Sequence, residues 1–175
     1  AVGTAVDNAG NSANAMTPAV NVDIHAPTTT SGLNGPVGSG GWYTGTVTVS
    51  LSASDSLSGV AATFYTVDDG PQQNYANTGP FSVFGDGTHT VTFYSVDVAG
   101  NTESTNTITV KIDGTAPTVS PGDVINTVWR NTDLSVNFTS SNATSGLANS
   151  DDAAFTLTAS AQSAGPGSPT VVSKT

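Results

Sequence analysis

Three aspartates in the first part of the chain are the best candidates for a binding site. Asp55 opens a short polar loop, Asp97 opens a turn of sequence Asp-Val-Ala-Gly-Asn, and Asp23 lies shortly before a proline. In a β-sandwich the two loops lie at one end of the domain, where the preceding linker also arrives. Carboxylate and carbonyl oxygens are what Ca²⁺ binds, about six to eight at a time. The pattern therefore predicts a calcium site at a domain junction.

The alternative interpretation is that these carboxylates are turn caps. An aspartate that opens a turn accepts hydrogen bonds from the backbone a few residues later, which accounts for Asp55 and Asp97 and leaves Asp23 exposed. The chain contains no compact D-x-D-x-D-G calcium loop, which favours this alternative. At the corresponding place later in the chain Asn142 replaces the acid, so a second calcium site is less expected there.

The sequence gives no support to catalysis. His25 and His89 are the two histidines, one predicted in a linker and one at the start of a strand. No nucleophile elbow, zinc-protease motif or phosphate-binding loop is present. The acidic pairs Asp68-Asp69 and Asp151-Asp152 fall in a predicted turn and a predicted loop, where solvated acids are common. We therefore expect a protein that is not an enzyme.

Aromatic residues offer a different chemistry. Trp42, Tyr43 and Trp129 stand at the start of predicted units and could stack on sugar rings. The alternative is that they close the end of a hydrophobic core. Lys111 alternates with apolar neighbours, so it is predicted to point away from the core.

Composition narrows the classes of partner. The 175 residues carry thirteen acids and three bases, a net charge of −10, which excludes nucleic acid and an acidic membrane surface as partners. No apolar run is long enough to insert in a membrane. Cysteine is absent, which removes disulfides and thiolate metal sites. A polar, uncharged composition rich in Ser, Thr and Asn is typical of secreted and surface proteins, so we expect an extracellular location.

An internal repeat organises the chain. The turn Asp7–Asn11 reads Asp-Asn-Ala-Gly-Asn, and the turn Asp97–Asn101 reads Asp-Val-Ala-Gly-Asn. In both copies another aspartate follows sixteen residues after the first, at Asp23 and at Asp113. Gly can adopt positive φ and Asp can cap the turn, so both copies are predicted β-hairpin turns. The recurrence indicates a tandem repeat.

Short alternating segments without helical periodicity predict an all-β fold of tandem β-sandwiches. Residues 28–117 form one complete predicted domain, which opens with a linker over residues 28–41. A looser pair of short strands is expected around Gly79-Pro80, and residues 1–27 are predicted to be the C-terminal hairpin of a preceding domain. The main predicted strands are Val2–Val6, Ala19–Ile24, Val47–Leu51, Val60–Val67, Thr90–Ser95 and Asn106–Lys111.

Residues 118–175 begin the same unit again, with predicted strands at Leu134–Phe138 and Phe155–Leu157. They lack a final hairpin, and residues 1–27 contain one. We therefore expect the chain to be one period of a two-domain repeat. It either continues covalently or is completed by strand exchange with other copies, since an unpaired sheet edge invites a partner strand. The remaining alternative is a fragment with arbitrary ends.

The turn and linker motifs resemble bacterial immunoglobulin-like repeats of the Big type. The linker phrase Asp-Gly-Thr-Ala-Pro also resembles the junction between consecutive repeats of that family. The resemblance covers nearly the whole chain and is strongest over residues 42–117. It departs at Asn142 and in the Ser/Gly/Pro-rich loop 161–169. The matching segments are Thr46–Asp55, Ser58–Val60, Gly79–Phe81, Asp86–Val91, Asp97–Asn101 and Asp113–Pro117.

The resemblance implies tandem immunoglobulin-like sandwiches, one complete and two partial, and a structural role. Such repeats occur in adhesins, cell-wall and S-layer-type proteins, and some bind calcium at their junctions. We expect a non-catalytic module of an extracellular fibre, filament or adhesin stalk, with other copies or adjacent repeats as partners. The alternative is a carbohydrate-binding or spacer module of a secreted polysaccharide-degrading enzyme.

Overall fold

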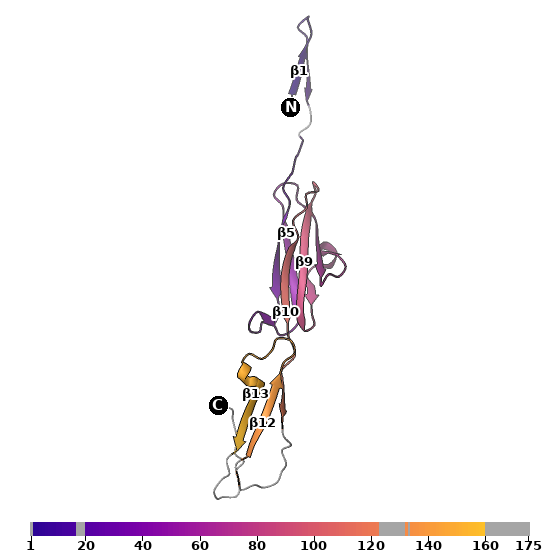
Figure 1. Cartoon of the computed structure of the whole chain (residues 1–175). Helices are drawn as coiled ribbons and strands as arrows, with labels where there is room; N and C mark the ends of the chain where they lie inside the picture. Colours follow the sequence, from indigo (N-terminus) through magenta and orange to yellow (C-terminus); the bar gives the residue numbers. More distant parts are fainter. Residues whose placement is uncertain (1, 17–19, 123–131, 133, 160–175) are drawn as a thin grey trace. The chain divides into compact units, whose positions relative to one another are not determined.

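The computed structural model describes residues 2–16, 20–122, 132 and 134–159, and these residues form an all-β protein of several sheets (Figure 1). The architecture is of the β-sandwich type, as the short alternating segments predict. None of the described helices is long and apolar enough to span a membrane.

Two sheets are built by the residues predicted to form the complete domain. The first of them, over the part of the chain that is described, has the strand order β4 (Trp42–Tyr43), β10 (Asn106–Ile112), β9 (Gly87–Asp97), β6 (Val60–Val67) and β7 (Gln73–Asn74). The other has the order β3 (Thr28–Asn34), β5 (Val47–Ser54) and β8 (Phe81–Val83).

Two smaller sheets contain the remaining described strands. The hairpin of β1 (Val2–Val6) and β2 (Ser12–Met16) is antiparallel, and its residues from Gly3 to Met16 are exposed. A second antiparallel sheet has the order β11 (Thr118–Pro121), β12 (Leu134–Ser141) and β13 (Ala154–Ala159), with the 3₁₀ turn η1 (Ser150–Ala153) before β13.

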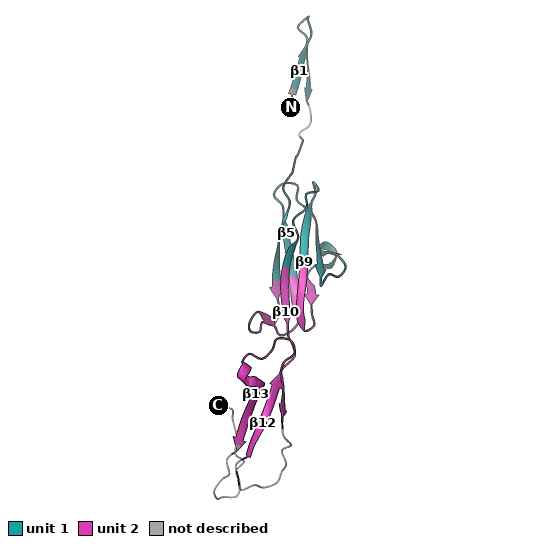
Figure 2. Cartoon of the chain, viewed as in Figure 1, with its two compact units in different colours: residues 1–32, 50–80, 92–107 teal, residues 33–49, 81–91, 108–175 magenta. Residues whose placement is uncertain are grey.

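The chain divides into two compact units (Figure 2). Unit 1 comprises residues 1–32, 50–80 and 92–107, and unit 2 comprises residues 33–49, 81–91 and 108–175. The division falls within β3, β5, β9 and β10, so each of these strands contributes residues to both units.

Alternation creates the buried part of unit 2. In β5, Val47 and Val49 are fully buried while Thr48 between them is partly exposed. Val91 of β9 is likewise fully buried, as is Val110 of β10. Burying one such side chain contributes about 1.5–3 kcal/mol, which fixes the face that each strand turns inward.

The buried part of unit 1 is unusually polar. Ser95 of β9 is fully buried, and its hydroxyl lies 2.7 Å from the Thr29 hydroxyl and 2.8 Å from the Thr63 hydroxyl. Glu103 accepts hydrogen bonds from the Thr29 amide at 2.8 Å and the Thr29 hydroxyl at 2.6 Å. The Ser95 amide and the Asn106 side chain also donate to Glu103, so this carboxylate joins three segments of unit 1.

Three sequence predictions of secondary structure were wrong. The described part of the segment Ala19–Ile24 is not a strand, because β1 pairs with Ser12–Met16 instead, and Val20 and Val22 are exposed. The first half of the predicted linker 28–41 is strand β3, whose Thr29 is held by Glu103. The first of the two short strands expected near Gly79 is the helical turn α1 (Tyr75–Thr78).

The strands at Leu134–Phe138 and Phe155–Leu157 are confirmed, but they pair in an unexpected way. β12 and β13 are neighbours in one sheet, and Phe138 lies directly opposite Phe155 in the ladder. The two rings stack with their centroids 5.3 Å apart. In the earlier segment the corresponding β5 and β6 belong to different sheets. The described strands β12 and β13 therefore pair differently from β5 and β6.

Candidate functional site

The three aspartates named from the sequence lie together in unit 1. One oxygen from each of Asp23, Asp55 and Asp97 can be chosen so that all three atoms lie within 4.8 Å of one another. Three different segments supply them: the stretch before β3, the loop after β5 and the end of β9. The convergence agrees with the sequence expectation that the two loops and the linker meet.

Asp55 is fixed by the loop that it opens. Its Oδ1 accepts hydrogen bonds from the amides of Leu57 at 3.0 Å and Gly59 at 2.8 Å. Gly59 has φ of 83°, a conformation that glycine adopts without strain, and the chain turns there into β6.

Asp97 is fixed by a turn of the same kind but is buried, with 2% of its surface exposed. Asn101 donates its amide to Oδ1 and its side-chain nitrogen to Oδ2, both at 2.7 Å. Burial raises the pKa of Asp97, but the hydrogen bonds from Asn101 and Gly100 lower it, so that the pKa lies below its usual value. The nearby charge of Asp23 opposes this lowering.

Asp23 ties the segment that precedes β3 to both of these loops. Its Oδ1 accepts from the His25 amide at 3.0 Å, and its Oδ2 accepts from the Ser58 amide at 2.9 Å. The Asn101 side chain donates to the backbone carbonyl of Asp23 at 3.1 Å. The bonds from His25 and Ser58 hold the pKa of the Asp23 carboxyl below its usual value. Asp23 is half-buried rather than exposed, contrary to the turn-cap interpretation.

The chemistry of the cluster is that of an oxygen-rich, negatively charged site. A carboxylate has about four lone-pair positions, so the hydrogen bonds to Asp23, Asp55 and Asp97 leave acceptor capacity for a cation. Oxygen-only ligands suit Ca²⁺. The same hydrogen bonds also account for Asp55 and Asp97 as turn caps, so the geometry fits both interpretations.

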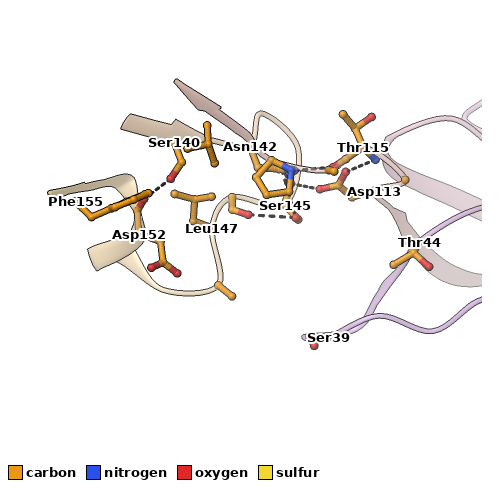
Figure 3. A pocket seen from close by; sticks show the side chains of 16 residues that line it. Ser39, Thr44, Asp113, Thr115, Ser140, Asn142, Ser145, Leu147, Asp152 and Phe155 are labelled. Atoms are coloured by element: carbon orange, nitrogen blue, oxygen red, sulfur yellow. Dashed lines mark hydrogen bonds between the residues drawn. The ribbon is translucent and has the colours of Figure 1, made fainter. Parts of the chain in front are cut away.

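A second group in unit 2 reproduces the linker contacts. Asp113 accepts from the Thr115 amide through Oδ1 at 3.1 Å and from the Ser145 amide through Oδ2 at 3.0 Å (Figure 3). Asn142 replaces Asp55, and its Oδ1 accepts from the amides of Thr144 and Ser145 at 3.0 Å. Its Nδ2 donates to the Thr115 carbonyl at 2.9 Å. The hydrogen bond from Ser145 makes the largest contribution to holding the pKa of Asp113 below its usual value.

A hollow of about 770 Å³ lies beside this second group. Its lining includes a polar wall of Asp113, Asn142 and Ser145, and the apolar side chains of Leu147 and Phe155 (Figure 3).

The place in unit 1 that corresponds to this wall is covered by the turn of residues 97–101. There the Val98 amide donates to the Gly59 carbonyl at 2.9 Å, and the Ala99 amide donates to the Ser58 hydroxyl at 3.3 Å.

Of the two histidines, His25 lies beside the aspartate cluster and His89 lies elsewhere. The exposed His25 ring has its Nδ1 atom 4.0 Å from Asp23 Oδ1, and the Nε2 atom of His89 lies 3.0 Å from the Gly85 carbonyl oxygen. The Lys111 ammonium lies 5.8 Å from the centre of the Trp42 ring, so a cation already occupies one side of that ring. Trp129 lies outside the described residues. Lys111 is exposed, as its alternation predicts.

Sequence reasoning did not identify Glu103 or the bridging role of Asn101. Glu103 is the chain's single glutamate, which was a usable signal, but its hydrogen-bond partner Thr29 lies 74 residues away. No protein-family model and no curated protein matches the chain.

Proposed function

We propose that the chain is a non-catalytic structural module of a bacterial extracellular fibre, filament or adhesin stalk, built from tandem immunoglobulin-like sandwiches. One observation carries this proposal. The linker aspartates Asp23 and Asp113 each accept two amide hydrogen bonds, one from the residue two positions downstream and one from a serine in the loop after β5 or after β12. A connection built twice in the same way is what a stack of repeated modules needs.

The mechanism is mechanical. Each linker is held at two points: its aspartate accepts from Ser58 or Ser145, and a carbonyl accepts from the side chain of Asn101 or Asn142. Fixing the linker at both points limits rotation about its backbone dihedrals, which stiffens the connection. The net charge of −10 keeps neighbouring fibres apart.

Asp113→Ala tests the stiffness. The variant removes the acceptor for the Thr115 and Ser145 amides, and their hydrogen exchange should accelerate while that of His25 and Ser58 stays unchanged. Small-angle scattering should show a broader distribution of maximum dimensions. Asp151→Asn, an exposed change that removes the same charge, serves as the control. An unchanged distribution for Asp113→Ala would contradict the stiffening role.

The extracellular location has its own test. Antibody against the folded chain should label intact source cells, and protease treatment of those cells should release its peptides. Labelling that requires permeabilised cells would overturn the surface assignment. Sugar binding that Trp42→Ala abolishes would instead favour the carbohydrate-binding alternative.

The calcium site remains a prediction with a direct test. If Ca²⁺ binds Asp23, Asp55 and Asp97, calcium at about 100 times its dissociation constant should stabilise the fold by about 2.7 kcal/mol. Asp55→Asn should abolish the shift and Asp151→Asn should not. An equal shift with Mg²⁺, or one retained by Asp55→Asn, would indicate charge screening and not a site.

A further inference from the structure

Unit 1 contains a complete docking arrangement between a turn and a loop. The turn of residues 97–101 donates three hydrogen bonds outward. Two go from the amides of Val98 and Ala99 to Gly59 and Ser58, and the third goes from the side chain of Asn101 to the Asp23 carbonyl. The receiving atoms are a glycine carbonyl, a serine hydroxyl and the carbonyl of a linker aspartate.

Unit 2 presents the same receiving atoms beside the hollow. Ser145 and Gly146 stand where Ser58 and Gly59 stand, and Gly146 has φ of 77° against 83° for Gly59. Asp113 accepts the amide of Ser145 as Asp23 accepts that of Ser58, so its carbonyl is placed by the same bond. All three residues line the hollow of about 770 Å³.

The chain also carries a second copy of the turn. In Asp7–Asn11, the Asn11 amide donates to Asp7 Oδ1 at 2.8 Å and its side chain donates to Asp7 Oδ2 at 2.9 Å. Gly10 has φ of 88° against 94° for Gly100, and its amide donates to the Asp7 carbonyl at 3.0 Å, as that of Gly100 donates to Asp97. All five residues of this turn are exposed. Its Ala9 amide donates to Asp7 Oδ1 at 2.9 Å, whereas the Ala99 amide donates to the Ser58 hydroxyl, so docking would exchange the bond to Asp7 for one to a partner.

We propose that the turn Asp7–Asn11 of a second copy of this chain docks in the hollow beside Asp113. Transferring the contacts of unit 1 assigns three bonds: the Asn8 amide to the Gly146 carbonyl, the Ala9 amide to the Ser145 hydroxyl, and the Asn11 side chain to the Asp113 carbonyl. The inference rests on the proposed function, in which copies of this chain follow one another, and it specifies how they join.

The proposed contact brings together fewer negative charges than the corresponding contact in unit 1. In unit 1 the docked turn brings Asp97 to Asp23 and Asp55, three carboxylates together. In the proposed contact Asp7 meets Asp113 and the neutral Asn142, so one negative charge fewer must be accommodated.

The contact can be captured by disulfides because the chain has no cysteine of its own. Two single variants, Ala9→Cys and Ser145→Cys, are mixed and oxidised at low concentration, and linked dimers are measured on a non-reducing gel. Ala99→Cys/Ser58→Cys is the matched positive control, since it joins the corresponding positions within unit 1. Ala9→Cys mixed with Ser135→Cys is the negative control, because Ser135 is exposed at the opposite end of β12.

We expect the first mixture to give a mixed dimer at least tenfold faster than the negative control. Equal rates in both mixtures, or no link where Ala99→Cys/Ser58→Cys closes, would overturn the proposal. So would a link that forms only within one molecule of an Ala9→Cys/Ser145→Cys double variant. Linker stiffness measured with Asp113→Ala is independent of this outcome, so failure of the docking and failure of the structural role are separable.

Discussion

At the scale of residues, Glu103 is the group whose loss should be felt most widely. Its two oxygens accept four hydrogen bonds, from Thr29, Ser95 and Asn106. Glu103→Gln replaces one oxygen by a donor that faces other donors, which should destabilise the fold by about 1–3 kcal/mol. Urea denaturation measures the change, and Asp69→Asn, an exposed substitution at equal charge, is the control. A loss no larger than that of Asp69→Asn would contradict the role of Glu103.

The same carboxyl predicts a dependence on pH. Burial raises the pKa of Glu103, but the hydrogen bonds that it accepts from Thr29, Asn106 and Ser95 together outweigh this effect. The pKa of Glu103 therefore lies below its usual value. Because the pKa is lower in the folded protein than in the unfolded chain, the ionised carboxylate stabilises the fold. This contribution is fully present above the pKa of the unfolded chain, about 4.3, and is lost as the pH falls through the pKa of the folded protein. Unfolding free energy should be level from about pH 7 to 5 and should drop below about pH 4. Glu103→Gln should lose less on acidification, and an equal loss would assign the dependence to other groups.

The two matched turns offer a comparison of asparagines. Asn101 donates to Asp97 and to the Asp23 carbonyl, whereas Asn11 donates to the exposed Asp7. Asn101→Asp adds a fourth carboxylate to the cluster of Asp23, Asp55 and Asp97 and should cost about 1–3 kcal/mol. Asn11→Asp should cost less than about 0.5 kcal/mol in the same thermal unfolding experiment, because its site is exposed. Equal losses of stability for the two variants would mean that the contacts of the turn 97–101 with Asp23 do not stabilise the fold.

At the scale of elements, alternation in β9 decides which side chains carry the fold. Val91 is 0% exposed and Val98, just past the strand end, is 68% exposed. Val91→Ala should cost about 2–3 kcal/mol because it removes buried methyl groups and leaves a cavity. Val98→Ala should change stability by less than about 0.5 kcal/mol in the same denaturant series. A similar loss of stability for both variants would contradict the conclusion that the buried face of β9 stabilises the fold.

The elements that the sequence predicted are those set by local rules. Val47, Val49 and Val91 alternate with polar residues, and Gly100 and Asp97 specify their turn without help from distant residues. The convergence of Asp23 with two loops was also predicted, from the geometry of a sandwich. Only some of the wrong predictions depend on partners far along the chain. Strand β3 looks like a linker because the partners that hold it extended, strand β5 and Glu103, lie about twenty and seventy-four residues away. Similarly, β13 pairs with β12 through Phe138 and Phe155, which no local pattern specifies. The turn α1 depends on a local cap instead, because the Asn74 side chain accepts from the Ala76 amide.

At the scale of the whole molecule, net charge opposes the contact between copies. Each copy carries −10, and screening shortens the range of this repulsion from about 30 Å at 0.01 M salt to about 8 Å at 0.15 M. The rate of disulfide capture between Ala9→Cys and Ser145→Cys should therefore rise with salt. The link within Ala99→Cys/Ser58→Cys joins parts of one molecule and should not respond. A capture rate that falls with salt would point to attraction between unlike charges.

One further consequence follows from the exposed hairpin of β1 and β2. Met16 is the single methionine, and because the chain has no cysteine, it holds the only sulfur atom of the chain. This residue is 80% exposed. An oxidant therefore has no sulfur to attack anywhere in the buried parts, and sulfoxide can form only at the end of this hairpin. The rate at which peroxide converts Met16 therefore reports how exposed the open end of the hairpin is, where Met16 pairs with Val2.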